Sequence, residues 1–232
     1  MKKLTTGVLL AGAALMSGTA FSQPASAAEV TLKFANWLPP FHHWTKTSRR
    51  FADSIEKASG GKLKINMDKA PLAKPPGQFD LAKNGVRDMI MHVAAYTPGR
   101  FVLYRMAEVP FATPNAETGS EGLHKWYTGH GFDKQEFKGT KLISAFVHGP
   151  GLLHSKKEIK TLEDIKSVKI RVGGGGVLMA KRLGAVPVAM SATKAHESLQ
   201  RGTTDAAFFP YESVSGFKLA KLVKFHLEIP GG

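Results

Sequence analysis

The residue with the clearest potential for chemistry is Arg171, in the apolar segment VKIRV at 168–172. Side chains alternate between the two faces of a strand, so the three apolar residues share one face while Lys169 and Arg171 share the other. Arg171 lies at the carboxyl end of this segment, where the loops of α/β sheets bind ligands. A guanidinium there can hold a carboxylate through two parallel hydrogen bonds. The alternative is an ordinary surface arginine paired with a neighbouring acid.

Four consecutive glycines at 173–176 follow, and backbone N–H groups at a helix start attract anions. The Lys-Ser/Thr pair of a phosphate-binding loop is missing, however, and the run lacks the spacing of a dinucleotide fingerprint. The histidines, among them His42, His43, His148 and His154, show no zinc-binding spacing, and the chain has no cysteine and no GxSxG motif. We therefore expect no nucleotide, metal, cofactor or catalytic activity.

Aromatic side chains gather where the expected strands end and loops begin. They are Trp37, Tyr96, Phe101, Phe111, Phe208, Phe209 and Tyr211. Most such residues form the hydrophobic core, and a few at the carboxyl ends of strands are placed to line an apolar pocket.

Strand-like and helix-like segments alternate along the chain, which is typical of α/β proteins with parallel sheets. A first series of segments ends at His148, and the turn-forming sequence GPG follows it at 149–151. A second series starts at Thr161, whose spacing to Asp164 predicts a capping box. Two such series indicate two lobes with a ligand cleft between them. The expected strands are 30–37, 62–67, 88–93, 140–148, 168–172, 187–190, 205–210 and 221–229, and the expected helices are 43–59, 120–128, 173–184, 191–202 and 212–220, with short ones ending at Gly85 and starting at Thr161.

The first 28 residues have the three regions of a secretory signal peptide. Lys2 and Lys3 precede an uncharged, largely apolar run at 4–21, and small residues at 25–28 follow. Polar residues and glycines interrupt the run and no basic stop-transfer cluster follows it, which favours cleavage near Ala27 or Ala28 over a membrane anchor. We therefore expect export to the periplasm.

The chain is strongly basic, with a formal net charge of +14, of which the two lysines of the signal segment contribute two. The basic residues are scattered and never form a block of five or six, so a diffuse field that attracts small anions is the better interpretation than nucleic-acid binding. Two alternatives stay open on these observations: a basic protein that binds polyanions, and a periplasmic hydrolase.

A series of segments resembles the solute-binding receptors of tripartite ATP-independent periplasmic (TRAP) transporters. Their order and spacing carry the resemblance more than any single motif, and together they cover nearly all of the chain after the signal segment. The segments are LKFANWLPP at 32–40, GGKLKI at 60–65, QFDLAKNGVRDM at 78–89, YTPGRF at 96–101, VPF at 109–111, TLEDIKSVKIRV at 161–172, LGAVPVAM at 183–190 and LQRGTTDAAFFP at 199–210.

The resemblance implies two lobes that close over an organic acid, with Arg171 gripping the carboxylate and the membrane permease subunits of a TRAP transporter as partners. Phe209 stands where many members have an asparagine, and GPGLL at 149–153 stands where many have a second arginine. Loss of these polar groups favours an aromatic or apolar monocarboxylate. We expect Trp37, Tyr96, Phe208 and Phe209 to line its pocket, with His148 and Glu212 as polar partners.

The expected organisation is a signal peptide at 1–28, a first α/β lobe at 29–148 and a partial second lobe at 149–220. Residues 221–232 are expected to start a hinge strand that returns to the first lobe. Members of the resembling family continue well past this point, so we expect the chain to lack elements that complete its second lobe.

Overall fold

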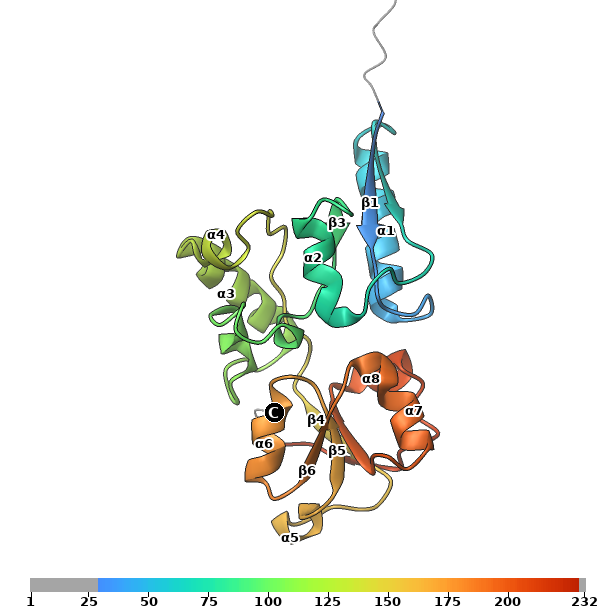
Figure 1. Ribbon diagram of the computed structural model, residues 1–232, viewed down its shortest axis with the longest axis vertical. Helices are drawn as coiled ribbons and strands as arrows, with labels where there is room; N and C mark the ends of the chain where they lie inside the picture. The colour runs from blue at the N-terminus through green and yellow to red at the C-terminus, as the bar shows by residue number, and fades with distance from the viewer. Residues whose placement is uncertain (1–28, 230–232) are drawn as a thin grey trace, which may run out of the picture.

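The computed structural model describes residues 29–229, so the expected signal peptide lies outside the described residues. Two α/β lobes follow one another along the chain and lie one above the other in Figure 1. The elements from β1 to α4 are called the first lobe, and those from β4 to β8 the second lobe. The expected two-lobe fold with mixed α/β sheets is confirmed. No helix among the described residues is long and apolar enough to cross a membrane.

The first lobe is built on a parallel three-stranded sheet with the order β2-β1-β3. The expected β-α-β-α-β series is present, although its last strand is shorter than predicted. The sheet and its crossover helices are β1 (Val30–Ala35), α1 (His43–Ala58), β2 (Leu63–Met67), α2 (Gln78–Lys83) and β3 (Met89–Ile90). The other elements of this lobe are the short 3₁₀ helices η1 (Pro75–Gly77), η2 (Ala94–Tyr96) and η3 (Tyr104–Glu108), and the helices α3 (Ala116–Gly129) and α4 (Phe132–Glu136).

Local signals explain where α1 begins and ends. The Nδ1 atom of His42, at the N-cap, accepts a hydrogen bond of 3.2 Å from the Trp44 N–H, which satisfies one of the free donors of the first turn. After Ser59, the chain turns at Gly60 and Gly61, whose φ angles are 61° and 81°. This left-handed backbone is open to glycine at little steric cost, so the helix ends here.

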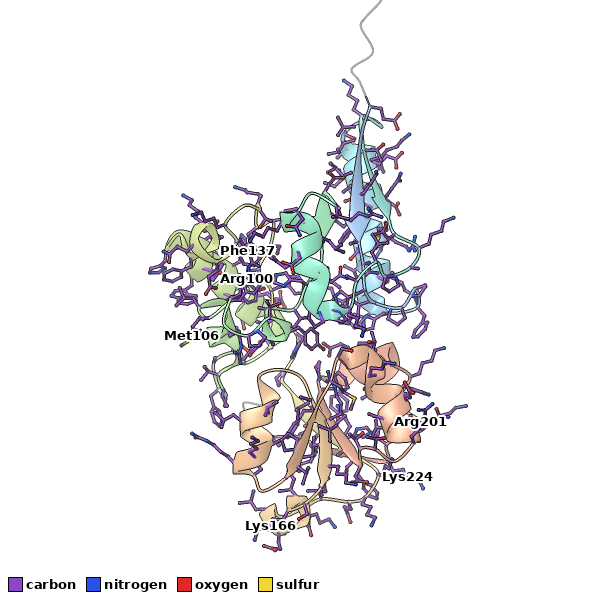
Figure 2. The ribbon with its side chains drawn as sticks, in the orientation of Figure 1. Arg100, Met106, Phe137, Lys166, Arg201 and Lys224 are labelled. Atoms are coloured by element: carbon purple, nitrogen blue, oxygen red, sulfur yellow. The ribbon has the colours of Figure 1, made fainter. Side chains whose placement is uncertain are left out.

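An aromatic core holds the outer part of the first lobe together. Phe79, Phe101, Phe137 and Tyr127 are buried in one cluster, and the Arg100 guanidinium lies 3.9 Å from the centre of the Phe79 ring. Figure 2 shows Arg100 and Phe137 close together between α2 and α4. Phe79 and Tyr127 lie on α2 and α3, while Phe101 and Phe137 lie outside helices and strands, so this packing fixes irregular segments to the helices.

The predicted strand at 140–148 is wrong, since no strand is present there. The backbone N–H groups of Ala145, Phe146 and Val147 donate instead to side chains of the same lobe, namely His124, Tyr104 and Ser120, at 3.2, 3.1 and 3.0 Å. Because these donors already have side-chain partners, the segment runs extended without joining a sheet in the described part of the chain.

The second lobe is built on a five-stranded mixed sheet with the order β6-β5-β7-β4-β8. Figure 1 shows α6 on one side of this sheet and α7 and α8 on the other. The predicted capping box of Thr161 and Asp164 is confirmed at the start of α5. The elements are β4 (Leu152–Ser155), α5 (Leu162–Ile165), β5 (Lys169–Val172), α6 (Gly176–Arg182), β6 (Val186–Ala189), η4 (Ala192–Lys194), α7 (Ala195–Gln200), β7 (Ala206–Phe209), α8 (Tyr211–Gly216) and β8 (Phe225–Leu227).

Two strands of this sheet differ from the sequence-based expectation. β4 was not predicted, because its residues LLHS are all buried and show no alternation of apolar and polar types. β8 was expected to return toward the first lobe, but Phe225–Leu227 pairs antiparallel with β4 as an edge strand of the second sheet. The end of the expected hinge segment, 230–232, lies outside the described residues.

Candidate functional site

The register of the second sheet places Arg171 beside β7 on the side that faces α7 and α8. Arg171 pairs with Ala207 on β7, and Phe209 lies two residues further on the same face of that strand. The Arg171 guanidinium therefore lies over the Phe209 ring, 4.1 Å from its centre. Ile170 and Val172 point to the opposite face and are fully buried in the other core cluster of the lobe, as their alternation predicts.

Three hydrogen bonds hold the Arg171 side chain. Its Nη2 atom donates to the Tyr96 hydroxyl at 3.2 Å and to the Met190 carbonyl oxygen at 2.9 Å, and Nη1 donates to the Phe208 carbonyl oxygen at 3.4 Å. The Nε atom is buried and has no partner within residues 29–229. A guanidinium has five N–H groups, so this arrangement leaves donors free for a further acceptor.

Arg171 is a buried cation without a counter-ion. Only 2% of the residue is exposed, and no carboxylate among the described residues forms an ion pair with it. Burial lowers the pKa of Arg171 from its ordinary value, while the nearby Tyr96 opposes this effect. Arginine still keeps its proton in proteins. Buried charges are normally paired, because desolvation costs several kcal/mol per ion. An anion bound at this side chain would therefore stabilise the folded protein.

Tyr96 joins the two lobes at this point. It ends η2 in the first lobe, and its hydroxyl oxygen accepts hydrogen bonds from Arg171 and from the Ala192 N–H at 2.9 Å, both in the second lobe. A tyrosine hydroxyl accepts two bonds and donates one. With both acceptor positions in use, the hydroxyl hydrogen of Tyr96 can donate to a bound molecule.

Trp37 follows β1 and packs edge-on against Tyr96, with ring centres 6.2 Å apart. The neighbouring Asn36 fixes this loop: its Oδ1 accepts from the Leu38 N–H at 3.1 Å and its Nδ2 donates to the Thr45 hydroxyl at 2.8 Å. The loop is thereby tied to α1. Trp37 also belongs to a buried cluster that contains Phe209 and other residues of the second lobe, so it lies at the contact between the lobes.

The predicted site residues divide into those that meet at this contact and those that do not. Arg171, Tyr96, Trp37 and Phe209 come together. The prediction for the Phe208 side chain is wrong: it packs into the opposite core with Leu153, because adjacent strand residues point to opposite faces. Only its carbonyl oxygen reaches Arg171.

The two predicted polar partners, His148 and Glu212, make other contacts. His148 is exposed, and its Nδ1 donates to the Gly149 carbonyl oxygen at 2.7 Å. Glu212 is half-buried in the first turn of α8. Its carboxylate lies near His43, whose pKa is lowered by burial while Glu212 opposes that shift. No hydrogen bond between these two residues and Arg171 occurs in the described part of the chain.

The glycine run at 173–176 meets the first lobe rather than a phosphate. A Cβ atom added to Gly174 would lie 2.1 Å from the Ala95 carbonyl oxygen, and one added to Gly175 would lie 2.6 Å from the Glu108 carboxylate. At α8, a Cβ atom on Gly216 would lie 2.6 Å from His42 Nε2. Real Cβ atoms do not come this close to other atoms. The missing side chains therefore let the lobes approach each other around Arg171.

Sequence reasoning missed several contributors to this site. The carbonyl oxygens of Met190 and Phe208 and the N–H of Ala192 act through the backbone, for which residue type gives no signal. A cavity of about 280 Å³ also opens next to Trp37, lined by first-lobe residues and by Thr193 of the second lobe. Its other lining residues are Asn36, Leu38, Pro39, Pro40, Thr45, Arg49, Asp68, Lys69 and Pro71.

The chemistry of this arrangement suits an anion. Its donors are a guanidinium, a phenol hydroxyl and an indole N–H, and its walls are aromatic. Within residues 29–229, no group of three or more His, Asp or Glu side chains is placed to hold a metal ion. The basic charge is spread over the surface, and Figure 2 shows Lys166, Arg201 and Lys224 on the outer side of the second lobe.

Comparison with known proteins places this geometry in context. A family model described as bacterial extracellular solute-binding protein, family 7, matches residues 34–229. A TRAP periplasmic solute-binding protein from Bordetella bronchiseptica with bound (R)- and (S)-mandelate is 34% identical, with a TM-score of 0.82 over 88% of this chain and 65% of that one.

Two further solved structures are similar. A TRAP solute-binding protein from Rhodoferax ferrireducens in complex with copurified benzoate is 36% identical, with a TM-score of 0.78 over 85% of this chain and 62% of that one. A marine metagenome TRAP solute-binding protein specific for aromatic acid ligands, in complex with 3-hydroxybenzoate, is 31% identical, with a TM-score of 0.79 over 86% and 63%. The chain spans 53–67% of the length of the curated relatives it matches.

Proposed function

The chain belongs to family 7 of the bacterial extracellular solute-binding proteins, the solute-binding receptors of TRAP transporters, and on that premise we propose that it captures an aromatic or apolar monocarboxylate. In this proposal the receptor works in the periplasm, hands its ligand to membrane permease subunits, and converts nothing chemically. The ligand lies between the lobes with its carboxylate at Arg171.

The observation that carries the proposal is the buried, unpaired Arg171. In the described part of the chain, Arg171 is 2% exposed, has a free Nε donor and lacks a carboxylate partner. An anion that enters with the ligand stabilises such a cation. The Tyr96 hydroxyl beside it supplies a second donor. A carboxylate satisfies both groups, since it is an acceptor with two oxygens and about four lone-pair sites.

The walls of the site favour an aromatic or apolar body. Phe209 and Trp37 are buried around Arg171 and Tyr96, and neither side chain carries a charge. Arg49 and Lys69 line the cavity next to Trp37, so the preference for a monocarboxylate rests on these aromatic walls and not on a lack of nearby cations. Three similar structures bind mandelate, benzoate and 3-hydroxybenzoate, which supports an aromatic acid for this chain as well.

The proposed organisation keeps residues 1–28 as a signal peptide and 29–148 as the first lobe, while the second lobe extends from 149 beyond the expected boundary at 220 to include β8. Among the predicted site residues, Arg171, Tyr96, Trp37 and Phe209 form the site in this proposal. His148 and Glu212 form no hydrogen bond with Arg171 among the described residues, and Phe208 contributes its carbonyl oxygen alone.

Thermal melting with a panel of acids tests the proposal. Succinate, pyruvate, lactate, benzoate and phenylacetate are each added up to millimolar concentration, so that weak binding also registers. A ligand at 100 times its Kd stabilises the folded state by about 2.7 kcal/mol. We expect benzoate or phenylacetate to raise the Tm and to be recovered unchanged. Stabilisation by succinate alone, or chemical conversion of the stabilising acid by pure protein, contradicts the proposal.

A further inference from the structure

The indole N–H of Trp37 is a buried hydrogen-bond donor without an acceptor. Trp37 is 5% exposed, and its Nε1 atom has no partner among the described residues. An indole nitrogen can only donate, so no rotation or change of tautomer relieves this state. Removing a donor from water without a partner is unfavourable enough that native structures rarely leave one so. An acceptor that arrives from outside the chain accounts for it.

The place of Trp37 indicates where that acceptor comes from. The ring packs against Tyr96, whose hydroxyl binds Arg171, so Trp37 belongs to the proposed ligand site. It also lines the cavity of about 280 Å³, whose lining does not include Arg171. Trp37 thus contacts both Tyr96, at the carboxylate-binding side of the site, and this cavity.

This cavity suits a polar substituent and not a bare hydrocarbon. Its lining combines Leu38 and three prolines with polar and charged side chains, which include Arg49, Asp68, Lys69 and Thr193. Thr193 comes from the second lobe, so the cavity spans the interlobe contact. Ligand pockets are usually about 300–1,000 Å³, so this space is large enough for one end of a small acid rather than for a second ligand.

We propose that Trp37 Nε1 donates a hydrogen bond to a second oxygen of the ligand, so that the receptor prefers hydroxy- or oxo-substituted acids over unsubstituted ones. This inference rests on the proposed function, because the same ligand places its carboxylate at Arg171. It assigns Trp37 a role in specificity in addition to its apolar contact: Arg171 selects for the carboxylate, and Trp37 selects for the oxygen on the body of the acid.

A pair of acids that differ by one hydroxyl group tests the role of the N–H. Mandelate and phenylacetate share a skeleton, and their affinities are measured by calorimetry for the wild type and for Trp37→Phe. We expect the wild type to prefer mandelate by about tenfold, which is the usual worth of one hydrogen bond. Trp37→Phe keeps an aromatic wall but has no N–H, so the ratio of the two affinities should fall to about one, with mandelate losing about tenfold more affinity than phenylacetate.

The matched control is Trp126→Phe, on α3, where the side chain is 36% exposed and remote from the interlobe cluster. It should keep the wild-type preference. A second measurement uses the wild type alone and does not depend on the folding of a variant. In its ¹H–¹⁵N spectra, one of the three indole N–H resonances should shift when mandelate is added and should not shift when phenylacetate is added. A preference for mandelate that persists in Trp37→Phe overturns the inference, as does an equal loss for both acids.

The two proposals fail in different ways. If the wild type binds neither acid, the proposed function is contradicted and the specificity role falls with it. If the wild type binds both acids equally, the proposed function stands and the role of Trp37 in specificity is overturned.

Discussion

Replacement of Arg171 by methionine should separate binding from folding. Methionine has a similar reach and no charge, so it can occupy the space under the Phe209 ring. The folded chain then loses three hydrogen bonds, to the Tyr96 hydroxyl and to the carbonyl oxygens of Met190 and Phe208. The two shorter bonds are worth about 1.5–3 kcal/mol each for a charged donor, and the 3.4 Å bond to Phe208 is weaker. It also loses the contact with the Phe209 ring, about 2 kcal/mol when desolvated.

The opposing gain is relief of the buried charge. Effective desolvation amounts to several kcal/mol for one buried ion, and Arg171 has no counter-ion that offsets it. The free energy of the lost contacts and the desolvation free energy regained are of the same size, so we expect the free energy of unfolding to change by about 2 kcal/mol or less in either direction. For a chain of this length that corresponds to a Tm shift of about 8 °C at most.

Ligand binding should respond far more strongly. A carboxylate in the Arg171→Met variant loses at least one charge-assisted hydrogen bond and is left buried without its cation, together about 3 kcal/mol or more. Affinity should therefore fall by at least about 100-fold. Calorimetric titration with the best acid of the melting panel measures this loss, and thermal melting without ligand measures the stability.

The control is the same substitution at Arg201, whose side chain is 73% exposed and which pairs with Glu197 on the outer side of the second lobe. Arg201→Met should leave the affinity unchanged. Binding by Arg171→Met within about threefold of the wild type refutes the assignment of Arg171 as the carboxylate anchor. A loss of stability far above 2 kcal/mol shows that the arginine is a structural element whose burial is well compensated.

Three further outcomes are expected. Arg171→Lys keeps the charge but loses the planar fork, so affinity should fall by about 1.5–3 kcal/mol in the same titration, and unchanged affinity contradicts a guanidinium-specific role. Gly174→Ala places a Cβ atom 2.1 Å from the Ala95 carbonyl oxygen, so the lobes should move apart. X-ray scattering should then give a larger radius of gyration, and the affinity for the ligand should be at least about tenfold lower. The control is Gly122→Ala, whose added Cβ atom has no other atom within 4 Å. Burial lowers the pKa of His92 from 6.5 to about 4, so its contribution to the free energy of unfolding is present above pH 6.5 and is lost as the pH falls toward 4. Denaturant titrations should show the free energy of unfolding fall by about 1–2 kcal/mol between pH 7 and 5 in the wild type, and by less in His92→Phe. An equal pH dependence of the two proteins contradicts this role of His92.

The sequence alone determined the order of most elements and the face on which Arg171 lies. Both follow from local rules: alternating apolar residues in VKIRV force Arg171 away from the core that holds Ile170 and Val172, and Thr161 and Asp164 cap α5 through atoms three residues apart. Local signals of this kind depend on neighbouring residues only, so they can be read without knowledge of the fold.

Strand pairing between distant segments and the hydrogen-bond partners of Arg171 were decided by the tertiary structure. β4 is a short, wholly buried run that pairs with β7 and β8, which are more than 50 residues away in the chain, and the segment 140–148 lost its expected strand to side chains of α3 and η3. The partners of Arg171 come from Tyr96, Met190 and Phe208, two of them backbone carbonyls. Which donors remain unpaired, and hence what the ligand must supply, is a property of three-dimensional placement: a buried group is satisfied or left free by whichever atoms the fold brings to it, however distant they are in sequence.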